Sequence, residues 1–129
     1  MVTRVAHSQS IIEESDRVEC AQKPYVKNGE KYIMMPGNAK KRHPIVEQRT
    51  LDLIAYAETA WFNRIEDGSD NTVGIITSST SYQYVKEVFP NASVLKIDMV
   101  HPLPEKAIRE FAEKTDKLLV VEELEPFIE

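Results

Sequence analysis

The chain has 129 residues and a formal net charge of −5 at pH 7, with a sequence pI of about 5.3. Hydrophobic residues make up 42% of the sequence and charged residues 29%, as in ordinary globular domains. The acidic balance argues against non-specific binding to nucleic acid or to an anionic membrane, because both need a basic surface.

Two further features narrow the class of protein. The single cysteine, Cys20, excludes an internal disulfide and a zinc or iron–sulfur centre held by the thiolates of this chain. No apolar run approaches the ~18 residues of a membrane span, and the N-terminus lacks the apolar segment of a signal peptide. We therefore expect a cytoplasmic protein with no membrane partner and no nucleic-acid partner.

Residues 1–42 have scattered apolar positions and no sustained period. We expect them to form an extended N-terminal segment, or a linker from a preceding domain. Two apolar pieces, Tyr25-Val26 and residues 32–35, flank Asn28-Gly29. They could pair as a hairpin, since Asn-Gly suits a turn with positive φ, or they could lie extended over the domain. Residues 36–38, Pro-Gly-Asn, are expected to stop any strand.

From Pro44 the apolar residues recur at helical spacing. The pattern predicts a helix over 44–60, with Pro44 in its first turn, where the missing N–H costs nothing. One face of this helix carries Val46, Leu53, Ile54, Ala57 and Trp61. We expect this face to cover one side of a sheet. Residues 66–71, "EDGSDN", predict a turn after the helix.

Strands and helices alternate after that turn. The patterns predict strands at 72–77, 93–99 and 117–122, a helix at 81–89, and another that Pro104 opens. Such an alternation with short connections favours right-handed crossovers and a parallel sheet covered by helices. Residues 43–129 are therefore expected to form an α/β domain of the three-layer αβα kind, Rossmann-like, with a mainly parallel sheet.

Both ends of the sequence suggest a piece cut from a larger chain. After the last strand, Leu124, Phe127 and Ile128 still need a surface to bury them. The opening residues, "VTRVAHSQS", read like the end of a strand.

In open parallel sheets, ligands bind beyond the C-terminal ends of the strands. The loop at Ser78–Ser81 offers four hydroxyl groups and a helix N-terminus that could hold an anion. Ser79, Thr80 and Ser81 are therefore candidate cofactor-binding residues. The alternative is that these hydroxyls only cap the helix, and the absence of a glycine-rich phosphate motif favours it.

Each of the other candidate residues could have either a functional or a purely structural role. His101 could be a general base or a ligand, or simply a hydrogen-bonded loop residue. Glu122, Glu123 and Glu125 could hold a divalent metal or act in acid–base chemistry, or they could be solvated. The basic run 40–43, "KKRH", could contact a phosphate-bearing cofactor, or could be a solvated linker. No self-sufficient catalytic set and no metal site is expected.

Five stretches together resemble the alpha subunits of indolepyruvate ferredoxin oxidoreductases. They are "RVAHSQSIIE", "YVKNGEKYIMMPGNAKKRHPIVEQR", "AETAWFNRIE", "VGIITSSTSYQYVKE" and "VLKIDMVHPLPEKAIREFAEKTDKLLVVEELEPFIE". The resemblance spans nearly the whole chain in one order. It implies the middle domain of that subunit, related to the transketolase C-terminal domain and to domain II of pyruvate:ferredoxin oxidoreductase.

The resemblance implies an intact enzyme that oxidatively decarboxylates arylpyruvates such as indolepyruvate. That enzyme would use thiamine diphosphate, magnesium, coenzyme A and iron–sulfur clusters, and would pass electrons to ferredoxin. Its partners would be the other domains of the alpha subunit and the beta subunit. This chain lacks the G-D-G…N motif and the cluster cysteines, so no catalytic residue of the family can be assigned to it. We expect no cofactor in this chain.

Three functions remain open at this point. The chain could be a non-catalytic structural domain that contacts neighbouring domains or subunits, and would be inactive alone. It could be a free-standing anion- or nucleotide-binding protein that uses Ser78–Ser81. It could also form part of a coenzyme A route, with Lys40–Arg42 near the phosphates.

Overall fold

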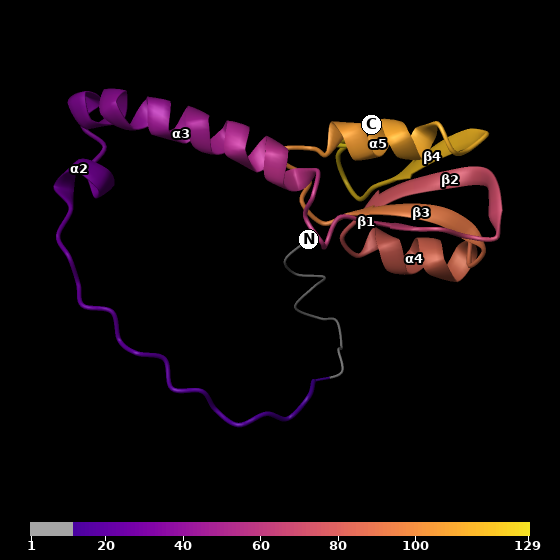
Figure 1. The fold of residues 1–129 in the computed structure, drawn as a ribbon, viewed down its shortest axis with the longest axis horizontal. Helices are drawn as coiled ribbons and strands as arrows, with labels where there is room; N and C mark the ends of the chain where they lie inside the picture. The colour runs from indigo at the N-terminus through magenta and orange to yellow at the C-terminus, as the bar shows by residue number, and fades with distance from the viewer. Residues whose placement is uncertain (1–11) are drawn as a thin grey trace. The chain divides into compact units, whose positions relative to one another are not determined.

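The computed structural model describes residues 12–129. Contacts between Cα atoms divide the chain between Arg42 and His43 into two units, which are described separately. The N-terminal side of that division carries α2 (Gly29–Tyr32) and the start of α3 (Pro36–Ala57). The C-terminal unit holds the rest of α3 and the elements of a sheet with two helices (Figure 1). These elements are β1 (Arg64–Glu66), β2 (Asp70–Ser78), α4 (Ser81–Val88), β3 (Ala92–Ile97), α5 (Glu105–Ala112) and β4 (Lys117–Val121).

The hairpin considered for residues 25–35 does not form. Asn28 is instead the N-cap of α2, and its Oδ1 accepts a hydrogen bond from the backbone N–H of Lys31 at 3.0 Å. Asparagine favours both positive-φ turns and helix N-caps, so Asn28-Gly29 alone did not distinguish the two. Tyr25 and Val26 lie in an extended stretch and are 87% and 72% exposed.

Helix α3 begins earlier than the sequence indicated. It starts at Pro36, the residue expected to stop a strand, and Pro44 therefore lies inside the helix rather than in its first turn. The sequence predicted a proline in the first turn of this helix, but that proline is Pro36 and not Pro44. Pro44 has no N–H to donate to the preceding turn, which makes it an unfavourable interior residue that the helix nevertheless accommodates.

The sheet has four strands in the order β1-β3-β2-β4. Strand β2 pairs in parallel with β3 on one side and with β4 on the other. Strand β1 was not predicted and runs antiparallel to β3, with Ile65 opposite Leu95. It has only three residues, "RIE", which is too short for a period to be recognised. The turn predicted at 66–71 is therefore shorter in the structure, because β1 ends at Glu66 and β2 begins at Asp70.

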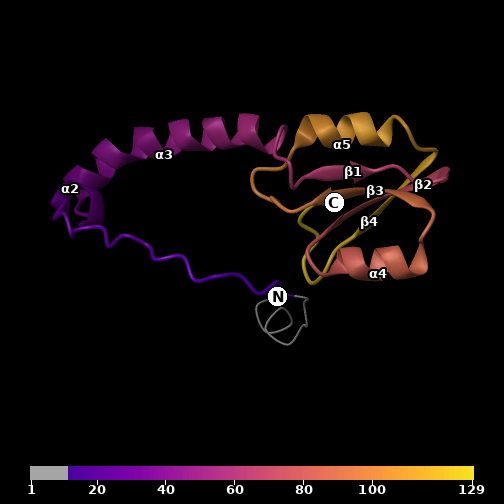
Figure 2. The ribbon, with the colours of Figure 1, turned by 60° about the horizontal axis from the view of Figure 1, so that its bottom comes forward.

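The two crossover helices lie on opposite faces of the sheet (Figure 2). The connection from β2 through α4 leads to β3, whereas the connection from β3 through α5 returns across β2 to β4. Right-handed crossovers that run in opposite directions must place their helices on opposite faces. The fold is thus the expected α/β class, with a mixed, open sheet between two helical layers.

The expectation that the long helix covers one side of the sheet is wrong. Helix α5 covers that side, and of the residues in α3 only Ala57 is buried. The side chains of Val46, Leu53 and Ile54 are 36%, 36% and 43% exposed. Amphipathic spacing correctly predicted the helix, but it does not specify which surface its apolar face meets.

The core consists of one cluster on each side of the sheet. Ile75 and Val94 pack with Val85 of α4, and Ile76 and Leu95 pack with Phe111 of α5. Consecutive strand residues point to opposite faces, so β2 and β3 supply both clusters. Ile128 packs against the second cluster, whereas Leu124 and Phe127 are 86% and 55% exposed.

Asn63 joins the end of α3 to the loop that follows β3. Its Nδ2 donates a hydrogen bond to the carbonyl oxygen of Ala57 at 3.0 Å. Its Oδ1 accepts hydrogen bonds from the backbone N–H groups of Asp98 at 2.9 Å and Met99 at 3.0 Å. One side chain therefore holds together segments about 40 residues apart in the sequence. Within residues 12–129 no helix is long and apolar enough to cross a membrane.

We predict that Gly68→Ala destabilises the domain. A Cβ at position 68 would clash with the backbone of Asn91 and Ala92, which cannot move aside as the end of a flexible side chain can. We expect a loss of about 1–3 kcal/mol in the free energy of unfolding, as for other overpacking changes, measured by urea denaturation. The control is Gly37→Ala, where a Cβ meets nothing within 4 Å. Equal effects at the two glycines would contradict the prediction.

Candidate functional site

The loops that follow β2, β3 and β4 lie at the same edge of the sheet, because the three strands are parallel. This edge is where ligands bind in open α/β sheets. The crossovers change direction between β2 and β4, so the loop at Ser78–Ser81 and the loop at Glu122–Glu123 flank the switch point. These two loops and the loop containing His101 include the residues singled out from the sequence.

The loop after β2 is linked to the loop after β4. Ser79 has a positive φ of 52°, a conformation that glycine, asparagine and aspartate adopt more easily than serine. Thr80 is the N-cap residue of α4, but its side chain makes no capping hydrogen bond. Its Oγ1 donates instead to Oε2 of Glu123, at 3.1 Å. Ser81 is 6% exposed. The carboxylate of Glu123 therefore already places a negative charge at the position suggested for a bound anion.

The carboxylate of Glu122 holds the residues that follow β4. It accepts hydrogen bonds from the backbone N–H groups of Phe127 at 3.1 Å, Ile128 at 2.7 Å and Glu129 at 3.2 Å. The ring of His101 is exposed and meets that of Phe127 edge to face, with 6.5 Å between centroids. In residues 12–129, no cluster of three or more His, Cys, Asp and Glu side chains could hold a metal ion.

The basic run contacts acidic side chains near it in the sequence. Lys41 Nζ lies 3.1 Å from Oε1 of Glu30, and His43 Nε2 lies 3.5 Å from Oε1 of Glu47. All four side chains are more than half exposed. Such pairs contribute little to stability. A phosphate that approached Lys41 would have to compete with Glu30.

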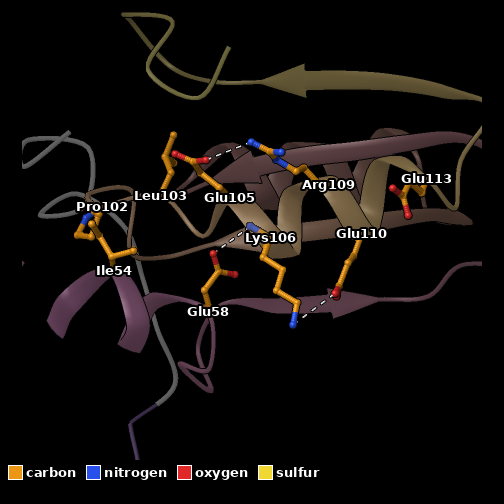
Figure 3. A pocket seen from close by; sticks show the side chains of 9 residues that line it. All are labelled: Ile54, Glu58, Pro102, Leu103, Glu105, Lys106, Arg109, Glu110 and Glu113. Carbon is orange, nitrogen blue, oxygen red and sulfur yellow. Dashed lines mark hydrogen bonds and ion pairs between the residues drawn. The ribbon is translucent and has the colours of Figure 1, made fainter. Parts of the chain in front are cut away.

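A groove of 540 Å³ lies between the end of α3 and α5 (Figure 3). Sequence reasoning did not find it, because it needs the end of α3 to meet the start of α5. Its apolar lining comes from Ile54, Pro102 and Leu103. The charged lining residues are Glu58, Glu105, Lys106, Arg109, Glu110 and Glu113.

Most of the charges around the groove interact with one another or with the backbone. Glu58 accepts hydrogen bonds from the backbone N–H groups of Lys106 at 2.9 Å and Ala107 at 3.1 Å. It thereby caps the first turn of α5, where free N–H groups favour a negative charge. Figure 3 shows this contact, together with the ion pairs Arg109–Glu105 at 3.4 Å and Lys106–Glu110 at 3.7 Å.

The lining of the groove decides what chemistry it can support. It contains no serine, threonine, cysteine or histidine, so no hydroxyl or thiol nucleophile and no imidazole base is available there for group transfer. Glu58 is bound to the helix start rather than directed at a ligand. The groove suits the packing of an apolar group from another protein segment better than it suits catalysis.

A second charged cluster fastens β1 to α4. The Glu66 carboxylate accepts hydrogen bonds from the Tyr82 hydroxyl at 2.8 and 3.0 Å and from Arg64 Nε at 2.9 Å. Lys86 Nζ lies 3.2 Å from Oε2 of Glu66. Partial burial raises the pKa of Glu66, but the hydrogen bonds from Tyr82, Arg64 and Lys86 outweigh it and bring the pKa below its usual value. The Tyr82 ring also contacts Lys96 Nζ, 5.0 Å from the centroid.

Comparison with curated proteins identifies relatives along almost the entire chain. The chain is 34% identical over 138 residues to the indolepyruvate oxidoreductase subunit IorA of Archaeoglobus fulgidus, and the match covers 98% of this chain and 21% of that protein. It is 34% identical over 110 residues to IorA of Pyrococcus horikoshii, covering 81% and 17%. It is 28% identical over 133 residues to IorA of Methanothermobacter thermautotrophicus, covering 98% and 22%.

These comparisons confirm the family resemblance found in the sequence. The chain spans about a fifth of the length of these relatives. No protein-family model matches the chain, and no solved structure matches it.

We predict that Glu58→Ala destabilises the C-terminal unit by about 1 kcal/mol, as the loss of a helix cap does. The reason is that the N–H groups of Lys106 and Ala107 lose their acceptor. The free energy of unfolding should be measured by urea denaturation. Glu113→Ala is the matched control, because Glu113 lines the same groove at the C-terminal end of α5, away from the N–H groups that Glu58 binds. A loss as large in Glu113→Ala as in Glu58→Ala would contradict the capping role.

We predict that the stability contributed by Glu66 depends on pH. Its folded-state pKa is lowered, so the contribution is complete above the unfolded-state pKa of about 4.3. It is lost as the pH falls through the lower folded-state value. The difference in unfolding free energy between wild type and Glu66→Gln should thus be largest near neutral pH and smaller at about pH 3. The exposed Glu87 on α4 provides the control, Glu87→Gln. A pH-independent difference at Glu66 would refute this account.

Proposed function

The chain is related over nearly its whole length to part of the indolepyruvate oxidoreductase subunit IorA, and we propose on that basis that it serves as a non-catalytic packing domain. The parent would be the alpha subunit of a cytoplasmic indolepyruvate:ferredoxin oxidoreductase. In that protein, residues 43–129 would hold neighbouring domains or the beta subunit in place. The observation that carries the proposal is the similarity over 98% of this chain but only 21% of the relative.

The strand-end loops support a structural role. Glu122 binds the backbone that follows β4, and Glu123 accepts a hydrogen bond from Thr80. Carboxylates thus occupy the positions where an active site of this fold class would bind its ligand. The proposed alternative, an anion or nucleotide at Ser78–Ser81, would require a phosphate to approach the carboxylate of Glu123.

The exposed apolar side chains support a role in contact with other protein. Trp61 is 82% exposed and its ring meets that of Phe62 edge to face, with 5.6 Å between centroids. Leu51 and Tyr56 on α3 are 59% and 47% exposed. Large aromatic side chains are over-represented among the residues that dominate protein interfaces. A small domain that served alone would gain little from exposing them.

The cofactors implied by the family do not fit the donor groups in this chain. Magnesium with a diphosphate needs carboxylate, amide or carbonyl oxygens gathered in one place, and residues 12–129 contain no such acidic cluster. An iron–sulfur cluster needs several thiolates, and the chain has one cysteine. We place thiamine diphosphate, magnesium, the clusters and coenzyme A in other parts of the enzyme, and no step of this domain proceeds through them.

The proposal predicts that the chain alone neither binds thiamine diphosphate nor oxidises 2-oxoacids. Titration calorimetry with thiamine diphosphate and magnesium should give no saturable heat. A thermal-shift series with nucleotides, coenzyme A and oxoacids should leave the melting temperature unchanged, whereas a true ligand at 100 times its dissociation constant adds about 2.7 kcal/mol. Saturable binding of thiamine diphosphate would overturn the packing role. A shift with phosphates that Thr80→Ala abolishes would instead favour the anion-binding function.

A further inference from the structure

The groove between the end of α3 and α5 has an apolar end and an acidic end. Ile54, Pro102 and Leu103 form the apolar end beside the start of α5 (Figure 3). Ile54 is 43% exposed there, so the described residues leave this end uncovered. At the other end, beside the last turn of α5, Glu110 and Glu113 line the groove. The volume of 540 Å³ leaves room for a large apolar side chain from outside.

The charges that line the groove do not balance. Among the described residues, four glutamates and two basic residues line it, which leaves an excess of negative charge. Glu58 is bound to backbone N–H groups at the start of α5, and Lys106 and Arg109 each pair with one glutamate of the same helix. Glu113 is the glutamate left over, because no hydrogen bond or ion pair within residues 12–129 reaches its carboxylate.

The position of Glu113 is unfavourable for a negative charge. It is the C-cap residue of α5, where the last carbonyl groups and the helix dipole repel a carboxylate. It lies three residues after Glu110, and like charges at that spacing on a helix also repel each other. The next residue, Lys114, does not line the groove. A cation brought to the acidic end from outside would relieve both repulsions, so the groove is complementary to a basic partner.

The lining also favours one conformation of that partner. Most of the lining residues lie on α3 and α5, whose backbone groups are bonded within each helix. An extended peptide would find no row of free backbone groups to pair with, whereas a helix satisfies its own. The two ends of the groove are separated by about the length of α5, which has 8 residues and so spans about 12 Å. Side chains roughly seven or eight residues apart on a partner helix cover that length.

We propose that the groove receives an amphipathic helix from another part of the longer polypeptide. A large apolar side chain of that helix packs against Ile54, Pro102 and Leu103, and a lysine or arginine about two turns away pairs with Glu113. The inference rests on the proposed function and names one surface through which the packing domain would hold its neighbour. The match covers only 21% of the relative, so a longer polypeptide has the length to supply such a helix. A helix of the same polypeptide also has a high effective concentration at the groove, which a second copy lacks.

Charge reversal at Glu113 tests the proposal, because its effect should differ between the isolated chain and the complete oxidoreductase. In the 129-residue chain, Glu113→Lys puts a cation at the C-terminal end of α5, where it is favourable, so the melting temperature should be equal or higher. In the complete enzyme, the new lysine repels the basic residue of the docked helix. The amides of the peptide covering Glu105–Ala112 should then exchange their hydrogens roughly tenfold faster than in the wild-type enzyme.

The matched control for charge is Glu87→Lys, because Glu87 is exposed on α4 and does not line the groove. It should leave hydrogen exchange at Glu105–Ala112 as it is in the wild-type enzyme. Faster exchange of equal size in both variants would contradict a specific pair at Glu113.

The apolar end is tested by Ile54→Ala. In the complete enzyme this truncation should also speed exchange at Glu105–Ala112 roughly tenfold, because the docked helix loses its apolar contact, and it should have little effect there in the isolated chain. The control is Ile45→Ala, since Ile45 is 53% exposed on the same helix and outside the groove. No difference between the two variants in the complete enzyme would overturn the apolar contact.

The possible outcomes separate the inference from the function on which it rests. Unchanged exchange at α5 in the Glu113→Lys enzyme would overturn the docked helix, whereas protection elsewhere in residues 43–129 on assembly would keep the packing role. Equal exchange of every peptide in the isolated chain and in the complete enzyme would overturn both.

Two results with the isolated chain would identify a different occupant and overturn the proposal. One is a higher melting temperature in the presence of hexylamine that Glu113→Gln abolishes, which would show that the groove takes a small organic cation. The other is a concentration-dependent dimer that Glu113→Lys disrupts, which would make the occupant a second copy. We expect neither.

Discussion

The structure depends on β2, which is bonded to a parallel strand on each side. Ile75 points into one core and Ile76 into the other, and both are essentially inaccessible to solvent. Because burial of apolar area is the dominant favourable term in folding, these two neighbouring side chains link the stability of the two helical layers. The crossover from β2 to β3 and the crossover from β3 to β4 run in opposite directions across the sheet. This difference places α4 and α5 on opposite faces and fixes which loops meet at the strand ends.

Carboxylates of the chain itself occupy two positions where a ligand would otherwise be favoured. Glu58 binds the first backbone N–H groups of α5, and Glu123 lies beside the start of α4 through Thr80. A helix N-terminus attracts negative charge whatever its source, so Glu58 takes at the start of α5 the place that a bound anion takes at other helix starts. The arrangement leaves fewer free N–H groups for a small anion at the start of α5.

The sequence predicted the elements well wherever a long apolar pattern was present. The helices at 81–88 and 105–112 and the three parallel strands were all anticipated. The omissions have physical causes. "RIE" is too short to show a period, and Asn28-Gly29 suits a turn as well as a helix cap. The contact of Glu58 with Lys106 joins residues 48 positions apart, and no local pattern encodes it. The face of α3 was identified, but its partner surface was not.

Asn63 has a consequence for the handling of the protein. Its side chain donates to Ala57 and accepts from both Asp98 and Met99, and only an amide offers a donor and an acceptor in that geometry. Hydrolysis of this amide to a carboxylate would keep the shape but remove the donor, and would set a negative charge near Asp98. Deamidation of Asn63 in a stored or heated sample would therefore weaken the link between the end of α3 and the loop after β3. The length of the chain would not change.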